Sequence, residues 1–455
     1  MHDLYIQELQ SALSEALKKK LQKLPLNRLK KRTIQRATID VNDIDPIEWL
    51  NAQEWHTKIF WSPRDIPQKT AGCGAVHHIV TDSFDVLKSI RGYLHDSDQA
   101  IRYFGGMRFD ANQPMAFEWF PYAKFRFVVP RFELITTDES QALSINFFVS
   151  PDDDSVELFA NLKEEILKLK PPRSVDQELA TIVEKIEQPQ KEQWNQMLDE
   201  ALQAIDREEF EKIVLAGKTV LSFKEPINAC QLLPHILKKN GRTFHFAFQF
   251  EHGVNFISMS PECLFQRDGD HICTEAIAAT RPRGATPEED ERLGQEMIIS
   301  DKDLREHRWV KKMIVDRLSP FCTHIDATSD EKLLKLSHVQ HLVSEFYADL
   351  SPGVQNEDIL EALHPTPAVG GYPQKAAMEK IAELEPFDRG WYAAPLGWVS
   401  QHAAEFAVAI RSALVQKEKL HIFAGSGIVK GSLPEKEWEE NRNKAQNFLQ
   451  LFNIT

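Results

Sequence analysis

The chain has 455 residues, 42% of them hydrophobic and 27% charged, a composition that excludes collagenous, fibrous and mostly disordered proteins. No apolar run approaches the ~20 residues of a membrane helix, and a net charge of −14 argues against nucleic acid as a partner. The five cysteines form no C-x-x-C pair, so neither a disulfide framework nor a zinc knuckle is expected, and a reducing, cytoplasmic location is favoured.

The N-terminal segment predicts a helix. Leucines recur at helical spacing from Leu4 to Leu24 and the pattern stops at Pro25. Residues 18–36 carry nine lysines or arginines, which we interpret as a solvated helix face, with a contact to an anionic surface as the alternative. No basic region precedes an apolar stretch here, so no secretory signal is expected.

Residues 1–190 alternate short apolar stretches with turns. The patterns predict strands at 124–137 and 142–150, a turn at 151–154, and helices at 155–169 and 176–186. Prolines near residues 171 and 189 mark a soft boundary. We therefore divide the chain into an N-terminal part, 1–190, and a catalytic region, 191–455.

The second part has sharper patterns. Helices are predicted at 193–205, at 287–317 as one or two helices, and after Pro434; strands are predicted at 211–221, 243–250, 254–259, 263–267, 271–278, 405–415 and 420–424. The phenylalanines of TFHFAFQF (243–250) alternate, so they should share one face of their strand. Runs of strands with inserted helices favour an α+β fold over a βαβ series.

A glycine-containing segment, FAGSGIVKGS (423–432), could bind an anion. We read it as a strand end followed by a turn that exposes backbone N–H groups. An ordinary glycine turn is the alternative. The segment is not a Walker A loop, because the order G-K-[ST] is absent.

Acidic residues on two predicted helices could bind a metal. Glu437, Glu440 and Lys444 are spaced by three and four residues, so they share one face of the last helix. Glu306 lies on an earlier predicted helix. Carboxylates from two helices suit Mg²⁺, although spacing alone does not pair Glu306 with Glu440, and a solvated helix face is the alternative.

Four single residues are candidates for acid–base or anion-binding roles. Lys212, at the start of an apolar strand, is either a solvated edge residue or a desolvated amine usable as a base. Glu262 is a turn carboxylate or an acid, and His341 is structural or catalytic. Arg411 ends the alternation EFAVAIR, where a guanidinium could clamp a carboxylate or pair with another ion.

The order of the motifs is more specific than any one of them. The chain contains, in sequence, EKIVLA, ISMSPECLF, TEAIAATRPRG, SDKDLREH, HVQHL, HPTPAVGGYP, EFAVAIR, FAGSGIVKGS and PEKEWEENRNKAQ. In this it resembles the chorismate-utilising enzymes, which include isochorismate, salicylate, anthranilate and aminodeoxychorismate synthases. The resemblance is strong over 194–455 and loose before it. It implies one large α+β chorismate-binding domain of two stacked antiparallel sheets flanked by helices, with chorismate as substrate and Mg²⁺ as cofactor.

The resemblance also assigns roles. It implies Lys212 as the base, Glu262 as the acid and His341 as a further catalytic residue. The implied metal ligands are Glu306, Glu440 and Glu437, and the implied substrate-binding residues are Thr280, Ala368, Arg411, Gly425, Gly427 and Lys444. The chain departs from the family at Ala279, where glycine is frequent, and at Gly217, where isochorismate synthases commonly have arginine.

Lys212 matches the position of a lysine base in members that use water rather than ammonia. The resemblance therefore implies addition of water at C2 of chorismate with loss of the C4 hydroxyl, which gives isochorismate. The stretch HPTPAVGG and the chain length favour a menaquinone-type isochorismate synthase without a glutaminase subunit, as a monomer or homodimer. The alternatives are a salicylate synthase, a siderophore-pathway isochorismate synthase, less so an aminating synthase, and, from another class, an inactive binding module.

Overall fold

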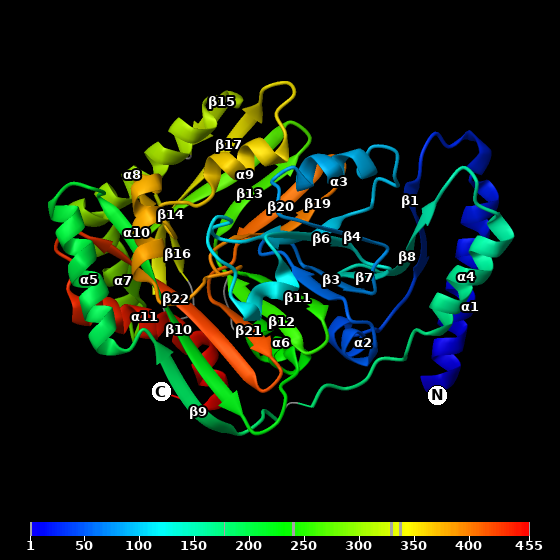
Figure 1. Ribbon diagram of the computed structural model, residues 1–455, viewed down its shortest axis with the longest axis horizontal. Coiled ribbons are helices and arrows are strands. Elements are labelled where there is room, and N and C mark those ends of the chain that lie inside the picture. Colours follow the sequence, from blue (N-terminus) through cyan, green and yellow to red (C-terminus); the bar gives the residue numbers. More distant parts are fainter. Residues whose placement is uncertain (1, 177, 239–241, 328–330, 336–338, 455) are drawn as a thin grey trace.

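The structure is a computed structural model that describes residues 2–176, 178–238, 242–327, 331–335 and 339–454 (Figure 1). The side chains at positions 2–4, 280, 302 and 306 lie outside the described part. Two antiparallel sheets stack on each other and helices cover their outer sides (Figure 1). This confirms the predicted α+β fold.

The first sheet has 12 strands within the described residues, and neighbouring strands are antiparallel. In sheet order they are β1 (Thr33–Asp40), β8 (Gln141–Val149), β7 (Phe132–Thr137), β3 (Gln68–Cys73), β2 (Lys58–Ser62), β11 (Phe244–Glu251), β12 (Val254–Ser260), β21 (Ser412–Gln416), β22 (Lys419–Val429), β10 (Lys212–Phe223) and β18 (Gly371–Tyr372), with β9 (Ile182–Gln188) also on β10.

The second sheet has 10 strands in the same described part of the chain. In sheet order they are β15 (Cys322–Ala327), β17 (Val339–Leu350), β14 (His271–Pro282), β13 (Cys263–Asp268), β20 (Ala403–Val408), β19 (Pro395–Val399), β5 (Tyr103–Met107), β6 (Phe125–Val129) and β4 (His77–Thr81), with β16 (Lys332–Lys335) also on β17.

The helices lie on the outside of these two layers (Figure 1). They are α1 (His2–Lys23), α2 (Pro46–Ala52), α3 (Val86–Leu94), α4 (Ser155–Leu167), α5 (Lys191–Asp206), α6 (Ala229–Leu237), α7 (Pro287–Ile298), α8 (Asp301–Leu318), α9 (Asn356–Leu363), α10 (Gln374–Leu384) and α11 (Pro434–Leu449), with 3-10 turns η1 (Leu26–Arg28), η2 (Phe117–Tyr122) and η3 (Gln450–Phe452). None of the described helices has the length and apolarity needed to cross a membrane.

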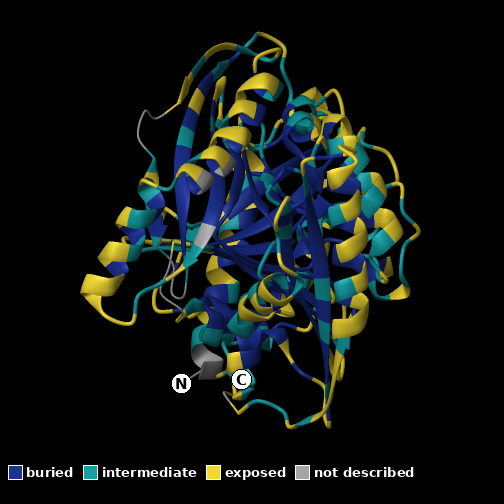
Figure 2. Cartoon of the chain, turned by 90° about the vertical axis from the view of Figure 1, so that its left-hand side faces the viewer, coloured by how far each residue is buried: buried dark blue, intermediate teal, exposed yellow. Residues whose placement is uncertain are grey.

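Central strands of the first sheet, such as β11 and β12, are buried on both faces. On β11 the side chains of Phe244, Phe246 and Phe248 pack into the core between the two sheets, as the alternation predicts. Ala247 belongs to a second core, between the first sheet and helices that include α1, α2 and α6. The strands are accordingly dark in Figure 2, while exposed residues follow the outer sides of the helices.

The chain passes between the two sheets at positions where the sequence predicts continuous strands. The predicted strand 124–137 is two strands, β6 and β7, in different sheets, and they are separated at Pro130. The predicted strand 405–415 divides in the same way into β20 and β21, on either side of Arg411. Both predictions were wrong at the crossover, because apolar alternation does not record which sheet receives a strand.

Three other local predictions are corrected by tertiary contacts. Residues 176–186, predicted as a helix, instead lead into β9, which pairs with the edge of β10; residue 177 lies outside the described part. The basic segment 18–36 is a helix face only to Lys23, since Arg36 is a buried residue of β1. The predicted turn at 425–427 is part of β22, which continues to Val429.

Candidate active site

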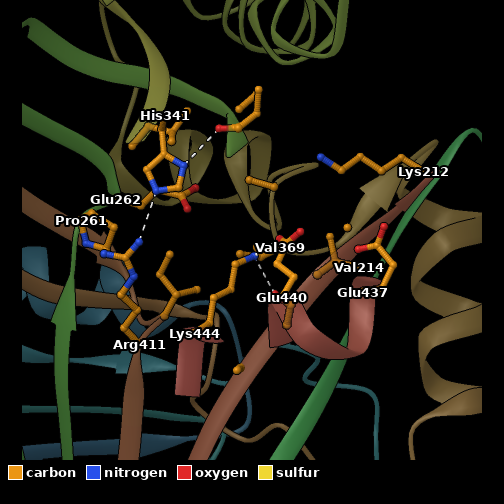
Figure 3. A pocket seen from close by; sticks show the side chains of 18 of the residues that line it. Lys212, Val214, Pro261, Glu262, His341, Val369, Arg411, Glu437, Glu440 and Lys444 are labelled. Atoms are coloured by element: carbon orange, nitrogen blue, oxygen red, sulfur yellow. Dashed lines mark hydrogen bonds and ion pairs between the residues drawn. The ribbon is translucent and has the colours of Figure 1, made fainter. Parts of the chain in front are cut away.

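A pocket of about 220 Å³ lies where the two sheets, α11 and the crossover segments meet (Figure 3). Its walls include ten of the residues selected from the sequence: Lys212, Glu262, His341, Ala368, Arg411, Gly425, Gly427, Glu437, Glu440 and Lys444. The side chains of Thr280 and Glu306 lie outside the described part, so their positions relative to this pocket are not described.

Glu262 stands at the crossover from β12 of the first sheet to β13 of the second. Its backbone N–H donates to the Ser260 hydroxyl at 3.2 Å, and the Thr366 hydroxyl donates to its Oε1 at 3.3 Å. Burial, reinforced by the charge of Glu275, raises the pKa of Glu262 to about 7. Near neutrality this residue is therefore a carboxylic acid in a substantial fraction of molecules and can donate a proton.

Lys212 is the first residue of β10 and reaches into the pocket from the side opposite Glu262 (Figure 3). Lys212 is half-buried, so its surroundings lie between the two that the sequence allows, a solvated strand edge and a desolvated site. A Cβ at Gly427, on the neighbouring strand, would lie 3.1 Å from Lys212 Cε. The glycine thus leaves room for the lysine side chain to enter the pocket.

Arg411 lies at the crossover from β20 to β21, with a positive φ of 48° that costs energy for a residue with a side chain. Its Nη2 donates to His341 Nε2 at 3.3 Å, and His341 Nδ1–H donates to the Ala279 carbonyl at 3.1 Å. Burial and the charge of Arg411 lower the pKa of His341 to about 3, so the imidazole is neutral. The histidine therefore holds a cationic guanidinium in the pocket, where it can bind an anion.

Ala279 itself has a φ of 57°, in the left-handed region that favours glycine. That conformation gives a backbone reason for the glycine that the family resemblance implies at this position. Gly217 has a packing explanation: a Cβ there would lie 2.9 Å from Asn441 Oδ1 on α11. The Asn441 amide uses this space to donate to the Ala424 carbonyl at 3.1 Å.

Helix α11 contributes an acidic and basic edge to the pocket (Figure 3). Lys444 Nζ lies 2.7 Å from Glu440 Oε1 and donates to the Gly425 carbonyl at 2.9 Å. Glu437 is held near the strand because its carbonyl accepts the Ser426 hydroxyl at 3.0 Å. The three α11 side chains predicted to share a helix face thus meet the same pocket.

Gly425 and Gly427 line the pocket as strand residues rather than as a turn. They pair with Ala216 and Val214 of β10. The pairing of β22 with β21 ends at Phe423. Beyond that residue, no strand among the described residues pairs with this edge of β22, and Lys444 bonds to the Gly425 carbonyl there.

The donor chemistry at this edge fits a hard cation. Glu437 and Glu440 present carboxylates, the ligand type that Mg²⁺ prefers. In the part of the chain that the structure describes, no three histidine, cysteine, aspartate or glutamate side chains cluster as metal ligands. A complete ligand set therefore requires a donor beyond these two, such as Glu306, substrate or water.

Two residues that bound the site were not selected from the sequence. Tyr392 lines the pocket, and its ring stacks on Phe423 at 5.3 Å between centroids; it follows no periodic pattern that would have identified it. Thr366 contacts Glu262 and is part of the motif HPTP, so the motif did contain the information.

Comparisons with known proteins agree with these observations. The profile of the family described as chorismate binding enzyme matches residues 16–453. Isochorismate synthase MenF of Bacillus subtilis is 35% identical, covering 90% of this chain and 91% of its own length. The salicylate biosynthesis isochorismate synthase of Pseudomonas aeruginosa is 33% identical, covering 89% and 87%. The structure of MenF, the menaquinone-specific isochorismate synthase from Escherichia coli, superposes with a TM-score of 0.85 at 28% identity, covering 97% of this chain and 100% of that one.

Proposed function

Because this chain belongs to the chorismate-binding enzyme family, we propose that it is an isochorismate synthase that adds water at C2 of chorismate with loss of the C4 hydroxyl. One observation supports the chemistry: Lys212 and Glu262 line the same pocket from opposite sides (Figure 3). A base and an acid so arranged can act on two ends of an allylic system at once.

In the proposed reaction the Lys212 amine is the base: it takes a proton from a water molecule as the oxygen of that water bonds to C2. The ring double bonds shift, and the bond from C4 to its hydroxyl breaks. Glu262, whose pKa is raised by burial, gives its proton to that departing hydroxyl. One water is consumed and one released, and a proton returns from Lys212 to Glu262 through solvent, so the net change is an isomerisation.

Charged groups in the pocket suit a substrate with two carboxylates. Arg411, oriented by His341, would bind one of them through charge-assisted hydrogen bonds. Lys444 and the edge of β22 at Gly425 and Gly427 would line the part of the pocket that holds the substrate ring. Thr280 and Ala368 complete the proposed substrate-binding set.

We assign Glu440, Glu437 and Glu306 as the ligands of a Mg²⁺ ion. When bound, this ion would neutralise a substrate carboxylate that the acidic edge of α11 would otherwise repel. In the structure the Glu440 carboxylate forms an ion pair with Lys444. This lysine therefore influences both where the carboxylate lies and the charge it presents to a metal ion.

Two of the relatives named above are called MenF, and the one from Escherichia coli is described as menaquinone-specific, which supports a place in menaquinone synthesis. The runner-up is an enzyme serving salicylate or siderophore synthesis, because the Pseudomonas relative is named for salicylate biosynthesis. Ala368 in the pocket favours accumulation of isochorismate over elimination of pyruvate, since salicylate-forming relatives tend to have a polar residue there.

Product identification tests the proposal. Purified protein incubated with chorismate and Mg²⁺ should give isochorismate in a mixture with chorismate, seen by chromatography. Added ammonium should give neither anthranilate nor aminodeoxychorismate. Stoichiometric salicylate and pyruvate as the first products would contradict the proposal and support the runner-up.

A further inference from the structure

We propose that the Arg64–Glu275 ion pair is a positioning device for Glu262, holding the peptide groups on both sides of the acid and supplying a charge that controls its proton. The inference rests on the proposed function, because it concerns the acid of that reaction. It adds two residues that lie outside the pocket lining and outside the roles assigned so far.

Arg64 makes three hydrogen bonds in this device. Its Nη1 donates to Glu275 Oε1 at 2.6 Å and its Nη2 donates to Glu275 Oε2 at 2.9 Å, a two-pronged arginine–carboxylate pair. Nη1 also donates to the Pro261 carbonyl at 2.6 Å. That carbonyl belongs to the peptide group directly before Glu262.

Glu275 binds the peptide group that follows Glu262. Its Oε1 accepts the backbone N–H of Cys263 at 2.7 Å, in the segment directly after Glu262. Both side chains are nearly inaccessible, with exposures of 5% for Arg64 and 3% for Glu275. The segment 261–263 is thus fixed on both sides of the acid at the point where the chain changes sheets, so Glu262 has little freedom to turn from the pocket.

The same pair contributes to the electrostatics of the acid. Burial is the main cause of the raised pKa of Glu262, and the negative charge of Glu275 raises it further. The charges of Lys212 and Arg411 lower it, as does the Thr366 hydrogen bond, and Tyr392 also faces the carboxyl. Burial raises the pKa of Glu275, and the Arg64 guanidinium and the Cys263 N–H oppose that rise because both stabilise the carboxylate form.

The first experiment changes the charge alone. Glu275→Gln keeps the side-chain size and an oxygen for Cys263 but removes the negative charge. The alkaline limb of kcat/KM reports the acid in the free enzyme and should move to lower pH by about one unit. A folded Glu275→Gln variant whose limb stays in place would overturn the proposal.

A matched control comes from another buried ion pair. Glu133 is inaccessible and is held by Arg36 at 2.9 Å and Arg102 at 2.8 Å, away from the pocket lining. Glu133→Gln should lower stability and leave the pH profile of turnover unchanged. The same shift in this variant would assign the effect to general loss of stability and overturn the inference.

Arg64→Lys provides a second route if Glu275→Gln does not fold. A lysine keeps the positive charge but cannot hold both Glu275 oxygens and the Pro261 carbonyl in one plane. We expect kcat to fall about tenfold, with KM for chorismate nearly unchanged, because a misplaced acid affects the chemical step and not the anchoring groups. A wild-type kcat in this variant would contradict the positioning role.

A failure of the proposed function would be distinguishable from a failure of this inference. If the wild-type protein forms no isochorismate, the function is wrong, and urea unfolding still tests the coupling. The effect of Glu262→Gln on the pH dependence of stability is measured in the wild-type and Glu275→Gln backgrounds. The pH range over which Glu262→Gln changes the unfolding free energy should end at lower pH in the Glu275→Gln background than in the wild-type background. The same pH range in both backgrounds would overturn the inference.

Discussion

Ionisation of the buried Glu262 carboxyl destabilises the folded state, and this effect can be measured without any substrate. Its pKa is raised from 4.5 to about 7, so the folded protein favours the protonated form. The protonated carboxyl therefore contributes stability that is fully present below pH 4.5, decreases as the pH rises, and is lost above about 7. The full shift corresponds to roughly 3 kcal/mol of unfolding free energy.

Glu262→Gln should therefore abolish turnover and also flatten the stability profile between pH 4.5 and 7. The measurement is urea unfolding at several pH values for both proteins. Wild-type turnover in the variant would show that Glu262 is not the acid. Parallel stability profiles would show that its proton is not held as the burial implies.

Lys212→Ala should reduce turnover by ~100-fold or more, because it removes the proposed base. Chorismate should still bind, since the anchoring guanidinium of Arg411 is untouched; calorimetry with the inactive variant measures this. The control is Lys430→Ala, a lysine just beyond β22 whose side chain is 81% exposed. Loss of binding together with turnover would assign Lys212 an anchoring role instead.

At the scale of the element, α11 combines packing with chemistry. Trp438 and Ala445 on one side of the helix are buried, while Glu440 and Lys444 reach the pocket. Because the helix is fixed by its apolar side, a change in the carboxylates should affect ligands more than the fold.

Glu440→Gln tests that separation. In the wild-type protein, EDTA should abolish turnover and added Mg²⁺ should restore it. The Glu440→Gln variant should bind Mg²⁺ at least tenfold more weakly in calorimetry, since a charged oxygen ligand is lost. Glu439→Gln, an exposed neighbour on the same helix, should bind the ion normally. Full activity of metal-free wild-type protein would refute the metal assignment.

At the scale of the whole molecule, the Glu405 carboxylate is one of the side chains that connect the two sheets. Glu405 of β20 accepts the indole N–H of Trp61, from the first sheet, at 2.7 Å. It also accepts Trp398 at 3.1 Å and the Gln266 amide at 2.8 Å. One buried donor, the Trp61 indole, and two partly buried donors therefore depend on one side chain.

Glu405→Ala should lower the unfolding free energy by on the order of 3–5 kcal/mol, because it leaves the buried Trp61 N–H and two partly buried donors without their acceptor. Glu405→Gln, which retains one acceptor oxygen, should cost less than half of that. Urea unfolding of the two variants gives the comparison. An alanine variant as stable as the wild type would mean that water replaces the carboxylate between the sheets.

The N-terminal part and the catalytic region are joined within both sheets. Strand β2 pairs with β11 in the first sheet, and β5 pairs with β19 in the second. Arg64, which follows β2, extends this connection to the acid of the proposed reaction. The first 190 residues are therefore part of the architecture that shapes the pocket.

The sequence by itself determined the elements whose patterns are local. The alternation at 243–250 predicted β11, and the spacing of Glu437, Glu440 and Lys444 placed them together on α11, because side-chain direction follows from the period of the backbone. The ordered motifs predicted the family, which the profile match bears out.

Only the tertiary structure decided where the chain changes sheets and what the site residues contact. Local patterns extended a strand through Arg411, treated Gly425 as a turn residue and gave no role to Arg64. Each of these depends on contacts between segments far apart in the sequence: the second sheet, β10 and Glu275, respectively. Periodicity reports which face of a strand is apolar, but it does not report which partner covers that face.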